Sequence, residues 1–547
     1  METVVIIRTS GTVTAPESVK VRGLSKSFQS IHDSLPNLWS KVEIIDDGWC
    51  GSDRLEEFLA RVEKVLGLSD PTEIDITVSE QREFTVQTTS WDSGLNKGLV
   101  GVLRQHHNHR IKSFTFNMDE ENSWDATGFH LVTDQMMWFP NVKSLTILNL
   151  GYYGQPWLML LWSIFSNGVS NGLADSKITS LRLSCVPDHR DGLLNHACFQ
   201  SCRSSTLTDI DAHVAPRVAV RFMATCPVLA RASWTFSNSW LPPLGFWATG
   251  SVVNHQQLLH LAIKSVPRGG HRHPWGNSFP HAIFSCILHH LRCPNLQSFT
   301  VGVDPSQKIG PMGENAPFIS EGWDEEQLGL REWFEDDDDS LHVRSNYFMD
   351  WYRRSGDAGD AVKQSSYIRS VAFKNGQKNH NETIVSDPFL PHFLDNFLDH
   401  SPSLKSLELI CIPFHPHHII NVLSRCPRLE TLKMREVQVP KGRFQGEYPE
   451  PLASGDLLNW LKDAGHLPNL RYLDWRLTRF PKRSGALEDL LNTLYNGGRG
   501  SLKEAHLWVG RNKDKAVVGG FDRKQLEDLR KGGLVLKVRS CEIYESG

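Results

Sequence analysis

The sequence lacks the features of a membrane-spanning chain, a secreted disulfide scaffold or a nucleic-acid binder. Its longest strongly apolar run, "WLMLLWSIF" at 157–165, is about half as long as a membrane span. The formal net charge of -4 gives no electrostatic reason to expect nucleic acid or an anionic membrane as a partner. The ten cysteines are scattered and show no paired Cys-x-x-Cys spacing. The N-terminal apolar patch is not followed by a small-residue cleavage site, so we expect a cytoplasmic or nuclear protein.

Catalytic motifs are also scarce. The chain has no phosphate-binding glycine-rich loop, no G-x-S-x-G turn and no H-E-x-x-H helix. Histidines cluster at 106–109, 271–273 and 415–418, but no cysteines accompany them at zinc-ligand spacing. We therefore expect no metal, no cofactor and no enzyme activity. The alternative, a hydrolase-like enzyme on an α/β scaffold, would need a cluster of acids and bases that the sequence does not indicate.

A short apolar pattern recurs along the chain instead. "SRCPRLETLKMREV" (424–437) resembles "LRCPNLQSFTVGV" from Leu291 and "GHLPNLRYLDWRL" from Gly465. Each copy has an L-x-x-L-x-L core, whose fourth and sixth positions fall on one face of a short strand. The copies begin at Ile111, Val142, Ile178, Leu207, Leu229, Leu258, Leu296, Ile368, Leu404, Leu429, Leu470 and Leu502.

Amphipathic helices are expected between these strands. The segments at 279–293, 390–400 and 417–426 repeat their apolar residues every three or four positions. A proline follows several helix ends, where it stops the helix. One strand and one helix of this length cannot bury both apolar faces alone, but stacked copies can. The pattern therefore predicts an α/β leucine-rich-repeat solenoid, a curved series of strand–helix repeats, over 101–547. The bland alternative is an ordinary α/β domain with leucine-rich strands.

One interval breaks the period. No copy begins between Leu296 and Ile368, and this interval holds the acidic run Glu335–Asp339. We expect 305–366 to be an acidic insertion or a degenerate repeat. The acidic run is either a solvated loop or a docking patch for a basic partner.

Residues 23–44 do not fit the repeat. "GLSKSFQSIHDSLPNLWSKVEI" spaces Leu24, Phe28 and Ile31 for one face of a short helix, and Pro36 ends it. The segment continues through Leu38 and Trp39 into an extended stretch. It resembles the C-terminal part of the fungal-type F-box, in which a short helix precedes a Ser-x-Pro-x-Leu-Trp step. The following 54–80 is similar to the helix and first strand that such proteins place before their repeats.

This resemblance implies a partner. F-box proteins dock onto a Skp-type adaptor of cullin ubiquitin ligases, and here the matching residues are Leu24, Phe28, Ile31, Pro36, Leu38 and Trp39. The family's Leu-Pro-x-Glu-like opening is absent from residues 1–20. Either ligase docking is impaired or lost in this chain, or the start was mis-assigned in a gene model. We expect a partial F-box-like segment at 1–45, a linker or N-terminal cap with the first strand at 46–100, and the repeats from 101.

The expected function is a protein-interaction scaffold. The resemblance suggests the substrate-recognition subunit of a cullin-type ubiquitin ligase; the alternative is a leucine-rich-repeat scaffold unrelated to ubiquitination. A protein substrate would bind the concave sheet face, where residues flanking the apolar strand positions point away from the core. On the last repeats these residues form one expected patch: Ser406, Glu408, Ile410, Thr431, Lys433, Arg435, Tyr472, Asp474, Arg476, Glu504, His506 and Trp508. Earlier strands offer mostly small groups, such as Ser144, Thr146 and Thr300.

Overall fold

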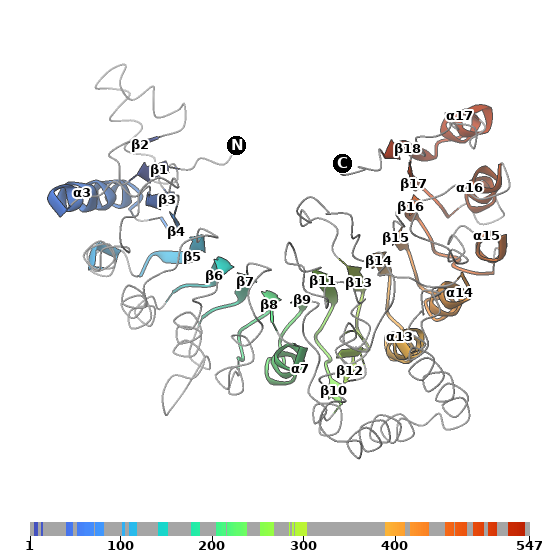
Figure 1. Cartoon of the computed structure of the whole chain (residues 1–547), viewed down its shortest axis with the longest axis horizontal. Coiled ribbons are helices and arrows are strands. Elements are labelled where there is room, and N and C mark those ends of the chain that lie inside the picture. Colours follow the sequence, from blue (N-terminus) through green and yellow to red (C-terminus); the bar gives the residue numbers. More distant parts are fainter. Residues whose placement is uncertain are drawn as a thin grey trace, which may run out of the picture. The chain divides into compact units, whose positions relative to one another are not determined.

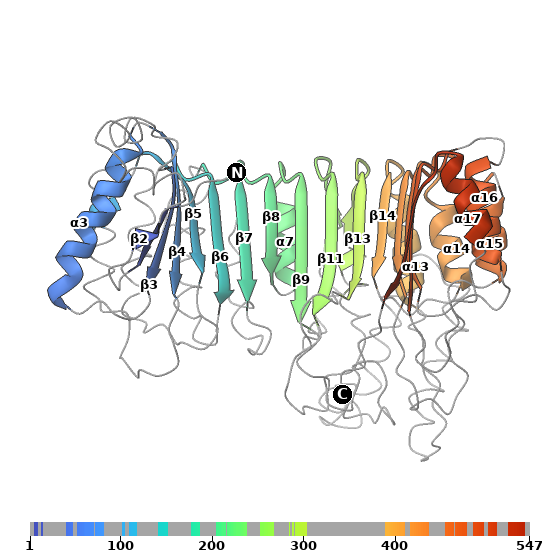
Figure 2. The same ribbon diagram turned by 90° about the horizontal axis from the view of Figure 1, so that it is seen from above.

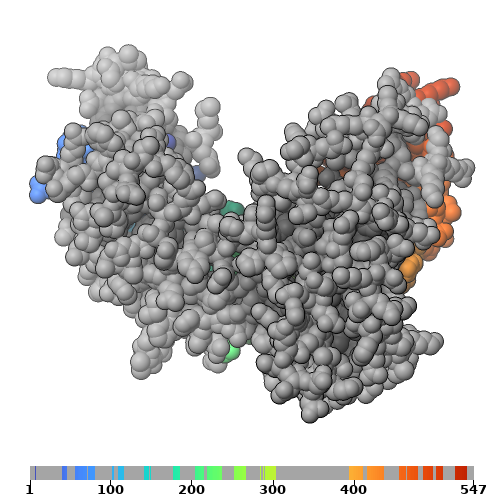
Figure 3. Space-filling view, viewed as in Figure 1, coloured from blue at the N-terminus to red at the C-terminus, as the bar shows by residue number. Residues whose placement is uncertain are grey.

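A computed structural model of the 547-residue chain shows a mixed α/β fold. Figure 3 colours the residues that the structure describes. They are 5–8, 13–14, 40–46, 52–70, 72–80, 101–103, 109–117, 141–150, 177–185, 204–214, 216–237, 252–266, 284, 287–288, 290–303, 389–410, 416–436, 455–463, 465–477, 485–496, 501–510 and 523–541. The chain divides into two compact units, Met1–Ala232 and Ser233–Gly547, and the boundary falls within strand β9 (Arg231–Ser237).

The N-terminal unit is built around a parallel sheet (Figure 1). Its strands follow one another in the order β8-β7-β6-β5-β4-β3-β1-β2, and only the β1–β2 pair is antiparallel. Its described strands and helices are β1 (Val5–Arg8), β2 (Val13–Thr14), β3 (Lys41–Asp46), α3 (Ser52–Leu68), β4 (Ile74–Glu80), β5 (Ile111–Asn117), β6 (Ser144–Leu150), β7 (Ser180–Cys185), β8 (Asp209–His213) and α7 (Pro216–Thr225).

The C-terminal unit also has a parallel sheet, in the order β18-β17-β16-β15-β14-β13-β11. A separate pair, β10–β12, is parallel too. The described strands and helices of the C-terminal unit are β10 (Val253–Asn254), β11 (His260–Val266), β12 (Leu291–Arg292), β13 (Ser298–Val303), α13 (Phe389–Asp399), β14 (Ser406–Ile410), α14 (Pro416–Ser424), β15 (Thr431–Arg435), α15 (Gly455–Lys462), β16 (Tyr472–Leu477), α16 (Ala486–Asn496), β17 (Glu504–Gly510), α17 (Arg523–Lys531) and β18 (Val535–Cys541).

The repeated motif explains these strands. The first apolar residue of each described copy is buried, as Leu404, Leu429, Leu470 and Leu502 show. The backbone carbonyl of the next residue then accepts two N–H groups from the following strand. Thus the Glu430 oxygen accepts from the N–H groups of two consecutive residues, Arg471 at 2.8 Å and Tyr472 at 3.0 Å. The same ladder recurs at Lys143, Thr179, Thr208, Leu259, Gln297, Lys405 and Arg471. Each copy therefore docks the next strand in the same register.

Every copy of the motif that lies within the described residues forms a strand, whereas the copy at Ile368 lies outside them. The expected acidic insertion at 305–366 also lies outside the described residues. The sheet begins earlier than the first strand expected within 46–100, because β1 pairs in parallel with β3 and β3 pairs with β4.

The helices follow the expected apolar spacing. Helix α3 buries Phe58, Val62, Val65 and Leu66, which recur at three and four residues on one face. Helices α13 and α14 occupy the segments expected at 390–400 and 417–426. No described helix is both long enough and apolar enough to cross a membrane.

The helix expected through 293 ends earlier. Phe284, Ile287 and Leu288 are helical, but Leu291 and Arg292 form strand β12. The N–H of Val253 donates to the carbonyl oxygen of His290 at 2.7 Å. Pairing with a distant segment therefore overrides the local helical periodicity.

Candidate functional site

The candidate site is the sheet face of β14–β18 that carries no described helix. Helices α13–α17 lie on the other side of these strands (Figures 1 and 2). Residues alternate between buried and partly exposed along β14, β15 and β16, because successive strand side chains point to opposite faces. We call the helix-free side the open face. Its members are Ser406, Glu408, Thr431, Lys433, Arg435, Tyr472, Asp474, Arg476, Glu504, His506, Trp508, Val535 and Lys537.

Strand register arranges the open face in three rows that cross the strands. The first row is Ser406, Thr431, Tyr472, Glu504 and Val535. The middle row is Glu408, Lys433, Asp474, His506 and Lys537. The last row is Arg435, Arg476 and Trp508, and the strands continue its register at Ile410 on β14 and Arg539 on β18. Neighbouring strands are about 4.8 Å apart, so each row is continuous.

The expected patch is therefore brought together in space, with one exception. Ile410 was expected to be presented on this face, but it is buried at 3% exposure. Its register partner on β13 is Gly302, and a Cβ built on Gly302 would lie 2.7 Å from the Ile410 Cβ. Because Gly302 has no side chain, Ile410 lies close against the β13 backbone and is shielded from water.

Glu408 is held by its neighbours. Its Oε1 accepts a hydrogen bond from Nη2 of Arg435 at 3.2 Å, and its Oε2 accepts one from the Thr300 hydroxyl at 3.4 Å. The Glu408 side chain is 18% exposed and that of Arg435 is 28% exposed. This ion pair joins β14 and β15, and it occupies the Glu408 carboxylate.

A hydrogen-bond chain crosses β16, β17 and β18. The Tyr472 hydroxyl lies 2.9 Å from Nδ1 of His506, and Nε2 of His506 lies 2.7 Å from Oε1 of Glu504. Lys537 donates to the same Glu504 oxygen at 3.4 Å. A carboxylate can only accept, so Nε2 of neutral His506 carries the hydrogen and Nδ1 accepts from Tyr472. The chain therefore fixes Tyr472 as a hydrogen-bond donor.

The groups around this hydrogen-bond chain favour a protonated Tyr472 and an ionised Glu504. Burial raises the pKa of Tyr472, and the nearby carboxylates of Asp474 and Glu504 raise it further. The hydrogen bond from His506 lowers the pKa of Glu504. Tyr472 thus keeps its proton, whereas a tyrosine that acts as a base or nucleophile needs a lowered pKa. The arrangement holds these polar groups in fixed positions on the open face.

Arg476 and Trp508 form the aromatic part of the last row. The Arg476 guanidinium carbon lies 4.9 Å from the centroid of the Trp508 ring, in a cation–π contact. Nε of Arg476 is shielded from water and has no hydrogen-bond acceptor among the described residues. Arginine, tryptophan and tyrosine are the residue types that contribute most to protein interfaces.

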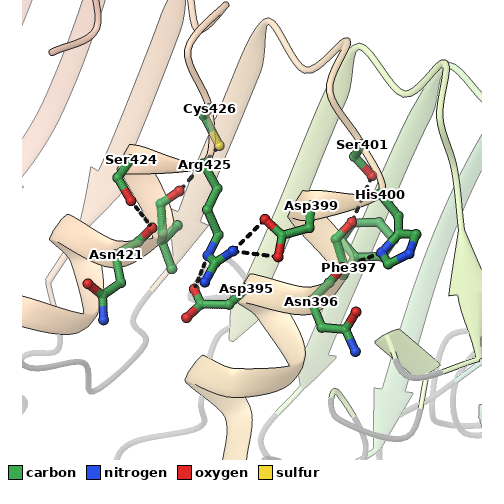
Figure 4. Close-up of polar contacts among 11 residues, drawn as sticks. Asp395, Asn396, Phe397, Asp399, His400, Ser401, Asn421, Ser424, Arg425 and Cys426 are labelled. Carbon is green, nitrogen blue, oxygen red and sulfur yellow. Dashed lines mark hydrogen bonds and ion pairs between the residues drawn. The ribbon is translucent and has the colours of Figure 1, made fainter. Parts of the chain in front are cut away.

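Two features of this unit were missed by sequence reasoning. Strand β18 lacks the L-x-x-L-x-L core, although the alternation of Leu536 and Val538 with Lys537 and Arg539 could have indicated it. A polar joint also ties α13 to α14: Arg425 reaches Asp395 and Asp399, which are four residues apart on one helix face (Figure 4). The spacing of the two acids was readable, but their distant partner was not.

The residues expected to bind the ligase adaptor lie in one segment of the sequence. Leu24, Phe28, Ile31, Pro36, Leu38 and Trp39 all lie outside the described residues. Strand β3 does begin within the extended stretch expected after them. Within the described residues, no group of three or more histidines, cysteines and acids could hold a metal ion.

Comparison with known proteins adds no relative. No protein-family model matches the chain, and a search of curated proteins finds no match.

Proposed function

We propose that the chain is a leucine-rich-repeat solenoid that serves as a protein-interaction scaffold, with the open face as its partner-binding surface. The repeated carbonyl ladder and the buried first apolar residue of each described copy support the solenoid. Such stacks leave one sheet face free over many strands, and this is the surface that they use for extended partners.

One observation carries the proposal. The open face gathers both charge signs, two arginines, a tyrosine and a tryptophan into continuous rows, and several of these side chains are held in fixed positions by one another. Fixed side chains lose little conformational freedom on binding, so their contacts contribute more fully to affinity.

We further propose that the scaffold is the substrate-recognition subunit of a cullin-type ubiquitin ligase in the cytoplasm or nucleus. The support is the F-box-like segment 23–44, which would contact a Skp-type adaptor. A protein substrate would then occupy the open face. A scaffold unrelated to ubiquitination is the outcome if no adaptor binds.

The substrate surface is tested with two matched variants. The open-face variant carries Arg435→Ala, Tyr472→Ala, Arg476→Ala and Trp508→Ala; the control variant carries Ser113→Ala, Thr115→Ala, Thr146→Ala and Arg182→Ala on the sheet of the N-terminal unit. We expect the open-face variant to lose capture of the main partner from a fungal extract, with a Tm within a few degrees of wild type. The control should capture it normally. Unchanged capture by the open-face variant would refute the proposed surface.

The ligase role needs a separate experiment. Purified Skp-type adaptor and cullin are mixed with this chain and with a chimera that places a complete F-box before residue 40. We expect weak or no binding by the chain and clear binding by the chimera. If neither binds, the ubiquitin-ligase assignment is wrong and a plain repeat scaffold remains.

A further inference from the structure

The last row of the open face has an unusual charge composition. From β15 to β17 it reads Arg435, Arg476 and Trp508, so it contains two basic residues, one aromatic residue and no acid. The middle row beside it alternates in sign instead, as Glu408, Lys433 and Asp474 show. Cross-strand pairs of opposite charge stabilise a sheet, whereas like charges directly opposite destabilise it. The middle row thus has a structural explanation that the last row lacks.

The two arginines of this row are not neutralised equally. Arg435 and Arg476 are register partners on adjacent strands. Arg435 has Glu408 as its ion-pair partner. Arg476 has no ion pair among the described residues; its contact is the Trp508 ring, and its Nε hydrogen has no acceptor. A donor that is shielded from water and unsatisfied is costly, and an incoming acceptor would remove that cost.

The carboxylates nearby cannot fill this role. Glu408 is engaged with Arg435 and Thr300, and Glu504 is engaged with His506 and Lys537. Asp474 is the remaining acid, and its Oδ1 is shielded and accepts no hydrogen bond among the described residues. The last row therefore contains the Arg476 guanidinium, which has no ion pair among the described residues. The middle row contains Asp474 Oδ1, which accepts no hydrogen bond among them.

An extended peptide satisfies both needs, because its acidic side chains pair with guanidinium groups and its backbone N–H groups donate to carboxylate oxygens. Strands lie about 4.8 Å apart, so the last row from Arg435 to Trp508 spans roughly 10 Å. Side chains on one side of an extended peptide repeat about every 6.7 Å. An acid between Arg435 and Arg476 and an apolar side chain over Trp508 match this spacing.

We propose that the open face binds an extended acidic peptide that contains the sequence acid-x-apolar and crosses strands β15 to β17. This inference rests on the proposed function and specifies the chemistry of the partner. The acid binds Arg476 in a bidentate manner beside Arg435, and the apolar residue packs on the exposed part of Trp508.

The test is direct binding of labelled peptides to the purified full chain, measured by fluorescence anisotropy. The probe is a ten-residue peptide that contains Glu-Ser-Leu at its centre. The comparison probes replace the acid by lysine, place the acid directly beside the leucine, or use a ten-nucleotide single strand of thymidines. We expect the first peptide to bind at least about tenfold more tightly than each comparison probe.

Protein variants locate the site. Arg476→Gln should weaken binding of the acidic peptide about tenfold, and Arg435→Gln somewhat less, because Arg435 is partly neutralised by Glu408. Lys112→Gln is the matched control, since Lys112 is an exposed strand cation of the N-terminal unit. It should leave binding unchanged. Normal melting curves for all three variants would exclude misfolding as the cause.

The results separate this inference from the proposed function. If the captured partner depends on the open face but acidic peptides do not bind, the inference is wrong and the proposed surface stands. Equal binding of the acidic peptide and the nucleotide strand would indicate general attraction of polyanions and would also overturn it. If neither the partner nor the peptide responds to open-face variants, both proposals fail.

Discussion

An arginine in each unit ties a helix to its neighbouring element, and the two arginines donate to different kinds of hydrogen-bond acceptor. In the N-terminal unit, Arg110 precedes β5 and reaches the turn after α3. Its Nε donates to the Thr72 carbonyl oxygen at 3.1 Å and Nη2 donates to the Leu66 carbonyl oxygen at 3.2 Å. Ser69 Oγ and Asp70 complete the set. The Arg110 side chain is only 5% exposed.

The joint of the C-terminal unit relies on carboxylates. Nη1 of Arg425 donates to both oxygens of Asp399, and its Nε lies 3.5 Å from Asp395 (Figure 4). The Arg425 side chain is 35% exposed. Burial raises the pKa of Asp395 to about 6, Arg425 opposes this shift, and Asp399 adds to it. Carbonyl acceptors do not titrate, whereas the raised pKa of Asp395 places its titration in mild acid, so the second joint should respond there.

The largest effect is expected at the buried joint. Arg110→Met fills similar volume but removes the guanidinium hydrogen bonds to the carbonyl oxygens of Leu66 and Thr72. Loss of these buried hydrogen bonds should lower the stability of this unit by about 2–4 kcal/mol. Hydrogen exchange at residues 66–72 and the thermal melting curve measure the loss.

Lys112→Met is the matched control for this substitution. Lys112 is 49% exposed and pairs with Glu73 at 3.2 Å. An exposed pair contributes about 1 kcal/mol or less. Comparable losses for both variants would mean that burial does not distinguish the two sites.

A smaller effect, with a defined pH dependence, is expected from Asp395→Asn. The pKa of Asp395 is about 6 in the folded chain and 3.8 in the reference state. The folded state therefore binds the proton more strongly, and this group reduces stability as pH rises from about 4 to about 6. The variant should lack that decrease, and at pH 7 it should be as stable as wild type or more stable, by about 1–2 kcal/mol.

Melting temperatures of wild type and variant at pH 4.0, 5.0, 6.0 and 7.0 give the difference directly. Other titrating groups cancel in this comparison. Arg110→Met should show no such pH-dependent difference from wild type. A difference between Asp395→Asn and wild type that stays constant across the range would contradict the assigned cause.

The smallest effect is expected from Arg425→Lys. Lysine keeps the charge but loses the two-pronged contact with Asp399, so the loss should be about 1 kcal/mol or less. Hydrogen exchange across α13 and α14 measures it, with Arg471→Lys as the control. Arg471 is 59% exposed and has a single contact with Glu430 at 3.8 Å. A loss equal to that of Arg110→Met would remove the contrast between the two joints.

Much of the strand arrangement could be predicted from the sequence, because each motif copy carries its own instructions. A buried leucine, a carbonyl that docks the next strand and two inward apolar residues recur within six positions. Pairings between distant segments without the motif could not be predicted. Strand β1 depends on β3, and β12 depends on β10, and neither partner is visible in the local pattern.

The open face was predictable in position but not in detail. Strand alternation assigns Tyr472, Arg476 and Trp508 to one face, and the structure brings them together. The bond from Tyr472 to His506 and the stacking of Arg476 depend on side-chain rotamers, which the sequence does not encode in a readable form. The roles of these residues in binding stay predictions.

Strand β18 has a further consequence for behaviour in solution. It is the last strand in its sheet order, and β17 is the one strand with which it pairs in the described part of the chain. Val535 on this strand is 51% exposed. An unpaired edge with an exposed apolar residue invites pairing with another molecule, and charged residues on such an edge discourage it. Lys537 follows Val535 two residues later on the same face. This cation of the open face thus also discourages edge-to-edge self-association.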